Sequence, residues 1–267
     1  MVKGYLSQLV NVINECQIQL SKGETLPVES EKIKQQALLI IDESVSSIQN
    51  VQKLLQKQAI SIHNDLLQAL SMVYTDKEKC LLLLSRVDKM ALEANHGLNE
   101  ELKKNYIIQE QFFSYSQELY KHFRALEIED AKIRVEAQKA KDKAKKYEKE
   151  RYYFLALGPF GLAGLATATG LFTSWSTKAS NASKKASKSK AQLEGLQASR
   201  DQIKMTQDSF GLCIGALSGV KNTLAFLSSG LHNIMQNNEN KNETLTLLTL
   251  YLNASISEVT ILMQDIA

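Results

Sequence analysis

The chain has 267 residues, of which 44% are hydrophobic, and a formal net charge of +3. These values exclude a largely disordered chain, and the net charge is too small to indicate a nucleic-acid partner. Only two prolines, Pro27 and Pro159, interrupt a sequence in which Leu, Ala, Lys, Gln and Glu dominate, and this mixture favours long helices over strands. We therefore predict an all-α protein.

The first half of the chain predicts three helices. The first runs from about residue 2 to residue 22 and is followed by 23–27, which supplies a helix-ending glycine and then a proline. The second begins at residue 28, and we expect it to continue until Asn95-His96-Gly97, after which a third begins near Leu98. The second helix carries an apolar stripe at helical spacing, formed by Ile41, Val45, Ile48, Leu55, Ile62, Leu66 and Val73.

The third helix changes character at Ile128, beyond which large apolar residues almost vanish. The inner face of 128–151 is predicted to consist of Ala131, Val135, Ala137, Ala140 and Ala144 among charges. The segment 178–204 repeats this composition with alanines among lysines and serines, and as helices the two segments each extend for about 35 to 40 Å. Their similar length predicts an antiparallel pair, which we call the neck.

The last part of the chain returns to apolar helices. A stretch over 210–235 is followed by a polar turn cluster at 237–242 and then by the last helix. That helix has the clearest amphipathic pattern of the chain, with Leu245, Leu248, Leu252, Ile256, Val259, Met263 and Ile266 on one face. The prediction is an elongated five-helix bundle, or rod. Its helical tail comprises 1–127 and 205–267, and its antiparallel neck comprises 128–151 and 178–204.

Between the neck arms lie 26 residues without a charge, 152–177, which we call the head. A stretch of this length can cross the roughly 30 Å hydrocarbon core of a bilayer. Pro159 prevents one uninterrupted helix, and antiparallel arms must leave the head on the same side of the membrane. This topology favours a hairpin whose halves are each about 18 Å long, near the thickness of one leaflet, although a single helix stays open.

We predict two sets of membrane-contacting residues, one within the head and one at its flanks. The set expected to insert into the bilayer is Phe154, Leu155, Leu157, Phe160, Leu162, Leu165, Leu171, Phe172 and Trp175. The basic set expected at the membrane surface, where it can contact anionic lipid, is Lys145, Lys146, Lys149, Arg151 and Lys178. A buried core helix and a permanent membrane anchor are the two other interpretations of this segment.

The sequence predicts neither an enzyme nor a bound metal or cofactor. The four histidines are dispersed, and none is three or four residues from another histidine or a cysteine. The glycines of 157–162 lack the context of a phosphate-binding loop. Three cysteines without a CxxC pair predict no disulfide framework. The first residues lack the continuous apolar core of a secretory signal, so we expect secretion without a classical signal peptide.

The order of these elements resembles the cytolysin A and haemolysin BL superfamily of α-helical pore-forming toxins, which includes two- and three-component members. The resemblance covers the whole chain and is carried by the five-helix rod and the apolar head sequence over 154–165. It implies a soluble protein that inserts its head into the membrane of a target cell and assembles into an oligomeric pore. Because this chain has one short apolar segment, it resembles one component of a system with partner components.

Two expectations about association follow. An exposed head would cause aggregation in water, and the Ala-rich neck has little apolar surface to cover it. We therefore predict a closed homo-oligomer in the soluble state, which dissociates before insertion. The alternative function is a membrane-anchored helical coiled-coil scaffold without lytic activity.

Overall fold

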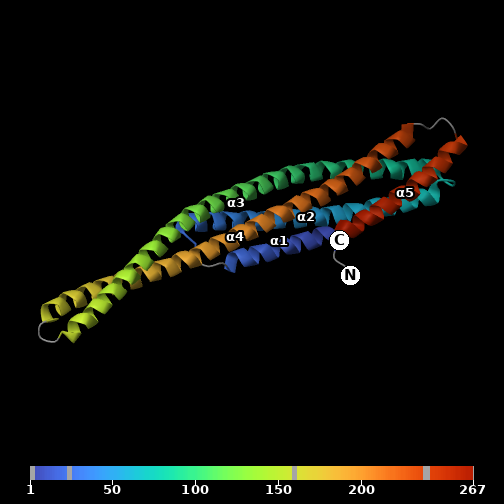
Figure 1. The fold of residues 1–267 in the computed structure, drawn as a ribbon. Coiled ribbons are helices and arrows are strands. Elements are labelled where there is room, and N and C mark those ends of the chain that lie inside the picture. Colours follow the sequence, from blue (N-terminus) through green and yellow to red (C-terminus); the bar gives the residue numbers. More distant parts are fainter. Residues whose placement is uncertain (1–3, 23–25, 158–160, 237–240, 267) are drawn as a thin grey trace. The chain divides into compact units, whose positions relative to one another are not determined.

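The computed structural model describes residues 4–22, 26–157, 161–236 and 241–266, with their side chains except at 162–163, 234–236 and 241–244. These residues form five α-helices and no strand (Figure 1). The helices are α1 (Tyr5–Lys22), α2 (Val28–Met72), α3 (Lys77–Ala156), α4 (Leu162–Gln236) and α5 (Lys241–Ile266). The predicted all-α fold, with five helices and the uncharged head where the third and fourth meet, is confirmed.

The chain divides into two compact units. Unit 1 comprises Met1–Ser21, Gln36–Tyr115 and Gln202–Ala267, and unit 2 comprises Lys22–Gln35 and Ser116–Asp201. The helices α2, α3 and α4 each contribute residues to both units. The division into tail, neck and head cuts the chain at other positions and stays a prediction.

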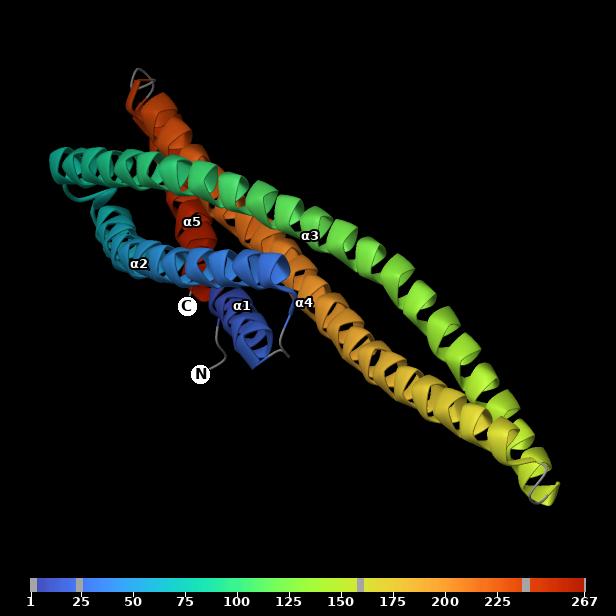
Figure 2. The same ribbon diagram turned by 90° about the vertical axis from the view of Figure 1, so that its left-hand side faces the viewer.

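Unit 1 is built around large apolar side chains. The ring of Phe112 on α3 stacks on that of Phe210 on α4, with 5.5 Å between their centroids, and both are fully buried. Farther along α4, α5 packs against it, and the hydroxyl of Tyr251 donates to the carbonyl of Leu227 at 2.7 Å (Figure 2). The apolar stripe predicted for the second helix is buried throughout, at Ile41, Val45, Ile48, Leu55, Ile62, Leu66 and Val73.

The C-terminal end of α5 is fixed by polar side chains of α2. The amide of Gln52 donates to the carbonyl of Ile266 at 2.6 Å and to Ser7 Oγ at 2.6 Å. The amide of Gln56 donates to the same carbonyl at 3.1 Å. The last carbonyls of a helix have no partner within it, so these bonds satisfy an acceptor that would otherwise be buried unpaired. They tie the last helix to the second within unit 1.

The break between the second and third helices differs from the prediction. It lies at 73–76, where the N–H groups of Thr75 and Asp76 both donate to the carbonyl of Met72. The carboxylate of Asp76 then accepts from the N–H of Lys79 at 3.1 Å and so caps the first turn of α3. In the sequence, the boundary between α2 and α3 is therefore marked by Thr75 and Asp76, which precede the charged first turn of α3.

The predicted helix end at Asn95-His96-Gly97 is wrong, because these residues lie inside α3. A glycine within a helix costs only about 1 kcal/mol relative to alanine, and packing of the flanking turns outweighs this cost. The neighbouring residues Ala94 and Leu98 are both buried in unit 1. A Cβ at Gly97 would meet nothing within 4 Å, so no close approach explains this glycine.

Unit 2 is dominated by two antiparallel helical arms, 116–156 of α3 and 162–201 of α4, which lie side by side in Figures 1 and 2. At one end of the arms the guanidinium of Arg200 lies 4.6 Å from the ring centroid of Tyr120. Nearby, His122 Nδ1 and Ser30 Oγ form a 2.8 Å hydrogen bond that joins the start of α2 to α3. Polar side chains therefore make many of the contacts at this end.

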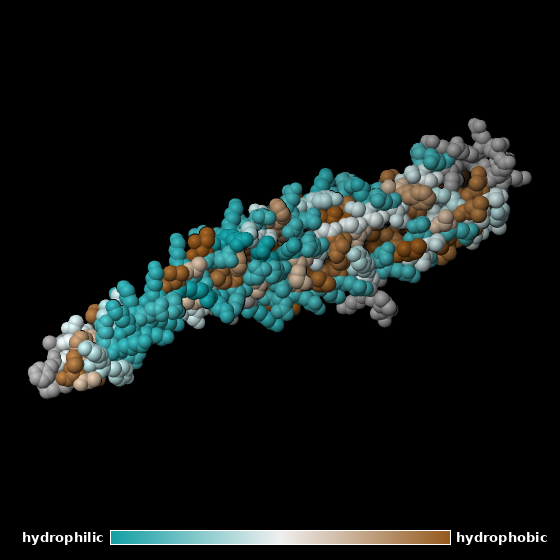
Figure 3. Space-filling model, in the orientation of Figure 1, coloured by the Kyte–Doolittle hydropathy of each residue, from teal (hydrophilic) through white to brown (hydrophobic). Residues whose placement is uncertain are grey.

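Leu119 and Leu196 are fully buried at one end of the arms, but the side chains buried at the described positions from 130 to 189 are small or polar. Along the predicted neck they include Ala137, Ala140, Ala144 and Ala179. Val135 and Ala131 were expected on this inner face but are exposed, with Val135 at 53%. The α-helical register explains the difference, because positions 137, 140 and 144 share one face that excludes 131 and 135. On the visible face in Figure 3, hydrophilic residues cover the arms and hydrophobic residues appear where α3 and α4 meet.

Candidate membrane-inserting site

The head is a helical hairpin, with α3 ending at Ala156 and α4 beginning at Leu162. Its geometry depends on Phe154, whose carbonyl accepts from the N–H of Leu157 at 3.3 Å. A Cβ at Gly161 would lie 2.2 Å from this carbonyl oxygen, and one at Gly164 would lie 2.5 Å from the Phe154 ring. Position 161 therefore requires glycine, because a Cβ would meet backbone, whereas a Cβ at Gly164 would displace the Phe154 ring.

The end of α3 presents large side chains to the surroundings. Four of the six residues from 152 to 157 are large, uncharged and exposed: Tyr152 at 58%, Tyr153 at 64%, Leu155 at 53% and Leu157 at 44%. Phe154 is only half-buried, although it covers Gly164. The candidates Leu155 and Leu157 are therefore accessible in this structure, and the two tyrosines accompany them.

The start of α4 has an apolar face toward α3. Ala168 is buried, with only 2% of its surface exposed, while Leu165, Phe172 and Trp175 are half-buried. Leu171 lies at the edge of this face and is 37% exposed. The exposed positions on the other side include Thr167, Thr173 and Ser174. Phe160 lies outside the described residues, as does the side chain of Leu162.

Cationic side chains surround the aromatic rings of the hairpin. The guanidinium of Arg151 lies 4.9 Å from the ring centroid of Phe172 and 5.3 Å from that of Tyr152. The ammonium of Lys178 lies 4.5 Å from the centroid of Trp175, and that of Lys143 lies 4.2 Å from it. Such contacts stabilise a cation by about 0.5–1 kcal/mol at exposed sites and by more where water is excluded.

The structure thus brings two of the five predicted basic residues, Arg151 and Lys178, onto aromatic rings of the head. The ammonium of a third, Lys146, lies 5.9 Å from the ring centroid of Tyr147 on α3. Lys145 and Lys149 lie exposed on α3, and Lys146 pairs with Glu150 at 3.8 Å. Sequence reasoning missed Lys143, which is 32 positions from Trp175. Only the register between the two arms, which periodicity within one helix does not give, places them together.

Length and composition alone indicate two segments that could cross a membrane, the first of which overlaps the head. The segments Gly164–Asn233 and Leu245–Ile266 each contain an 18-residue window with a mean hydropathy of 1.4. Core helices pass the same test, and α5 buries Leu248, Leu252 and Val259 in unit 1. Only 28% of this α5 window is buried, and Leu247, Leu250 and Ile261 are exposed, so one face of α5 packs in the core and the other is uncovered.

The cysteines do not provide a reactive site. Cys16, Cys80 and Cys213 are buried free thiols of unit 1. Burial raises the pKa of each above its ordinary value, to about 12 for Cys213. The thiolate is the nucleophilic form, so these groups are inert at neutral pH. No cluster of three potential metal ligands occurs among the residues that the structure describes.

Comparison with known proteins identifies the fold. No protein-family model and no curated protein sequence matches the chain. Soluble AhlC of the tripartite α-pore forming toxin AHL from Aeromonas hydrophila is similar over 99% of this chain and 100% of its own, with a TM-score of 0.81 and 19% identity. The SmhB pore of the tripartite α-pore forming toxin Smh from Serratia marcescens is similar over 98% and 95%, with a TM-score of 0.54 and 13% identity.

A further similar structure is the HblL1 toxin component from Bacillus cereus, with a TM-score of 0.52 and 11% identity over 99% of this chain and 94% of that one. The chain therefore has the fold of components of multi-component α-pore-forming toxins. The resemblance inferred from the sequence is confirmed at the level of the fold, along nearly the whole chain.

Proposed function

We propose that this chain is a component of a multi-component pore-forming toxin and that its head, 152–177, enters the membrane of the target cell. The observation that carries the proposal is the uncharged hairpin with four exposed large side chains, Tyr152, Tyr153, Leu155 and Leu157. An exposed apolar cluster of this kind is typical of an interaction site. The fold shared with AhlC and the SmhB pore supports the same assignment.

The charges at the two ends of the head limit how deeply it inserts. On α4, Phe172 follows Leu162 by ten residues, which corresponds to about 15 Å, half of the roughly 30 Å hydrocarbon core. Arg151 lies beside Phe172, at the end of this stretch. Deeper insertion of the hairpin would carry the Arg151 charge into the hydrocarbon core, which is costly. The hairpin therefore occupies one leaflet, and a pore through both leaflets requires further apolar segments from partner components.

The basic residues next to the head bind the membrane surface in this scheme. Arg151 and Lys178 are kept on aromatic rings of the hairpin, while Lys145, Lys146 and Lys149 follow on α3 toward the neck. Each basic residue near an anionic leaflet contributes about 1 kcal/mol of attraction, which salt screens. Tyrosine and tryptophan side chains favour this same headgroup boundary.

Before membrane contact the exposed head requires a cover, and we propose that other copies of the chain provide it. Dilution tests this step, because Trp175 is the only tryptophan and lies in the head. Concentrated protein is expected to have an oligomeric mass and blue-shifted emission, and both should be lost on dilution. A monomeric mass at every concentration with blue-shifted emission would contradict the oligomer and leave the membrane role standing.

The proposed function is tested by dye release from liposomes. The chain alone should bind the liposomes without releasing dye, whereas addition of the products of neighbouring genes should cause release. Release by the chain alone would contradict the need for partners. Failure to bind any liposome would contradict the membrane role.

Solubility separates the toxin component from the alternative scaffold. A component that inserts only on membrane contact should be recovered from the aqueous fraction without detergent. A permanent anchor would require detergent for extraction, and that result would favour the scaffold.

A further inference from the structure

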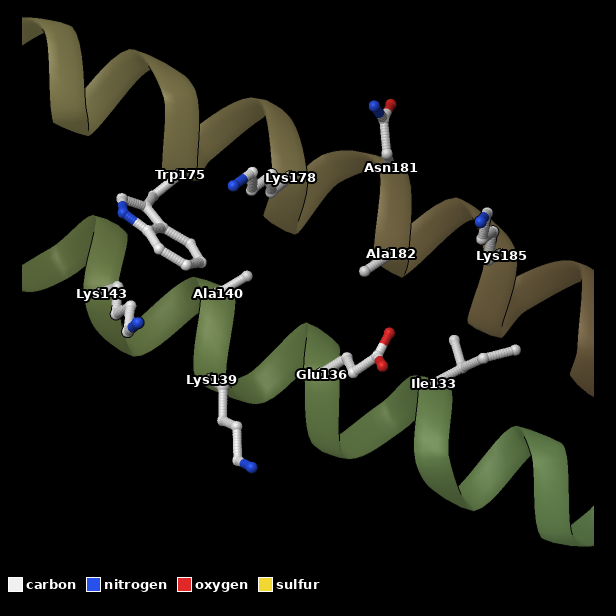
Figure 4. A pocket seen from close by; sticks show the side chains of 10 residues that line it. All are labelled: Ile133, Glu136, Lys139, Ala140, Lys143, Trp175, Lys178, Asn181, Ala182 and Lys185. Carbon is white, nitrogen blue, oxygen red and sulfur yellow. The ribbon is translucent and has the colours of Figure 1, made fainter.

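A basic groove lies between the two arms of unit 2, directly beside Trp175 (Figure 4). Its volume is about 420 Å³. The small side chains of Ala140 and Ala182 face the space between the helices and leave it open, and Trp175 lies at the end of the groove nearest the head. Four lysines and one acidic residue also line it: Lys139, Lys143, Lys178, Lys185 and Glu136. The groove therefore combines an aromatic wall with an excess of positive charge.

The positive charge is concentrated at the indole. The ammonium nitrogens of Lys143 and Lys178 lie 4.2 and 4.5 Å from the same ring centroid, so they are within about 9 Å of each other. Like charges at this separation repel. Along the described part of the chain, no ion pair within 4.0 Å includes any of the four groove lysines. An anion bound in the groove beside these ammonium groups would offset the excess positive charge.

The groove lies at a level where such an anion is available, a step that rests on the proposed function. Trp175 follows Leu162 by 13 residues, which corresponds to about 20 Å along α4. One leaflet contributes about 15 Å of hydrocarbon. With the hairpin inserted to that depth, Lys143, Lys178 and Trp175 lie at the level of the lipid phosphates. Lys139 and Lys185 then lie farther out, on the aqueous side.

We propose that this groove binds the phosphate of an anionic phospholipid headgroup, with Lys143 and Lys178 as its direct cationic partners. Both ammonium groups lie over the indole of Trp175, and this contact restrains the two side chains before the ligand arrives. Lys139 and Lys185 increase the positive field of the groove, whereas Glu136 limits the negative charge that it accepts. A defined site of this kind gives saturable binding, unlike the diffuse attraction expected of Lys145 and Lys149 on the open surface.

The test uses the full chain and the fluorescence of Trp175. One titration adds inorganic phosphate at constant ionic strength, with chloride as the reference. A second adds vesicles of phosphatidylcholine, either pure or mixed with phosphatidylglycerol, and co-sedimentation gives an independent measure of binding. The groove variant is K143Q/K178Q. The matched control is K141Q/K184Q, which removes the same charge from exposed sites on the same two helices, each within about 10 Å along the helix of the lysine it matches, and neither site lines the groove.

Wild type and control should both show a saturable change in Trp175 emission with phosphate and with phosphatidylglycerol vesicles. The groove variant should lose the phosphate response and bind these vesicles about tenfold more weakly, while its binding to pure phosphatidylcholine stays at the wild-type level. Circular dichroism should show the same helix content for all three proteins, because the substituted lysines are exposed.

Three results would overturn the proposal. Equal weakening of the two double variants would mean that the attraction is diffuse. A phosphate response no larger than that of chloride would show that no phosphate site exists. Saturable binding of inorganic phosphate without preference for phosphatidylglycerol would assign the groove to a soluble ligand rather than to a lipid. Failure to bind every vesicle would instead contradict the proposed function, and the phosphate titration would still decide whether the groove is an anion site.

Discussion

The helices α3 and α4 bury different kinds of side chain in the two units that they pass through. In unit 1 they pack Phe112 against Phe210. In unit 2, Leu119 and Leu196 are buried at one end of the arms, whereas the side chains buried at the described positions from 130 to 189 are small or polar and include Ala140, Ala144 and Ala179. Full burial of a phenylalanine contributes about 1.5–3 kcal/mol, and each buried methyl-sized group contributes about 0.8 kcal/mol. The same pair of helices is therefore fixed strongly at one end and weakly at the other. This difference predicts that unit 2 opens at a lower free energy than unit 1, as a segment that changes partners on a membrane requires.

The largest expected effect lies in the core of unit 1. Phe112→Ala should lower the free energy of unfolding by about 3–5 kcal/mol, because it removes a fully buried ring and leaves a cavity beside Phe210. Urea unfolding followed by circular dichroism measures this loss. The adjacent Phe113 is 55% exposed, so Phe113→Ala should change stability by no more than about 0.5 kcal/mol. Equal losses in the two variants would contradict the described core.

A charge in the head should remove membrane binding without unfolding the protein. Leu155→Asp places a carboxylate on a side chain that is 53% exposed in the hairpin, and a charge in the bilayer interior costs about 3 kcal/mol. Vesicle binding should therefore fall roughly a hundredfold, with helix content unchanged. Leu82→Asp is the control, because Leu82 is 71% exposed in unit 1 and should not enter the membrane. A folded Leu155→Asp variant that binds vesicles like wild type would refute the assignment of the head.

Two glycines of the head should respond oppositely to the same substitution. A Cβ at Gly164 would lie 2.5 Å from the ring of Phe154, so Gly164→Ala should destabilise the hairpin by about 1–3 kcal/mol. Gly170 has nothing within 4 Å of its Cβ position, so Gly170→Ala should stabilise α4 by about 0.5–1 kcal/mol. Amide hydrogen exchange over 152–177 measures both changes. The same sign in both variants would contradict the packing of Phe154 on α4.

The last expected effect arises only at alkaline pH and concerns unit 1, which contains all three cysteines. Burial raises the pKa of Cys213 from 9.0 to about 12, so the folded state keeps a proton that the unfolded state loses. Stability should therefore fall as the pH rises above 9, by up to about 1.4 kcal/mol per pH unit, until the folded thiol also ionises near pH 12. Cys213→Ala should remove this share of the slope in urea unfolding between pH 9 and pH 11. An unchanged slope would show that the thiol is not buried.

Periodicity predicted the parts of the fold that depend on one helix at a time. The stripe from Ile41 to Val73 is buried as expected, and the uncharged head lies where α3 and α4 meet. The boundary between the second and third helices was misplaced because Gly97 looked like a stop, whereas one glycine is outweighed by burial of Ala94 and Leu98. The actual boundary is set by the side chain of Asp76, which caps α3. A cap of this kind involves a single residue and is therefore a weak signal in the sequence.

Features that depend on how the arms align were not predictable from the sequence. The contact of Lys143 with Trp175 and that of Phe154 with Gly164 require a register between α3 and α4. A helical repeat gives the face of each arm but not the longitudinal alignment of the two. For this reason Lys143 was absent from the predicted basic set, although it lies closer to the indole than Lys178 does.

The most direct test of membrane entry is quenching of Trp175 by lipids brominated at a known depth in the acyl chain. Vesicles are added to the full chain after dilution to the concentration at which the soluble oligomer has dissociated and the blue shift of Trp175 is lost, and co-sedimentation confirms binding. Insertion of the head into one leaflet predicts a blue shift of the Trp175 emission and stronger quenching by bromine close to the headgroup than by bromine near the chain end. Emission that neither shifts nor is quenched by either lipid, in protein that sediments with the vesicles, would show that the chain binds membranes by another surface and would contradict insertion of 152–177.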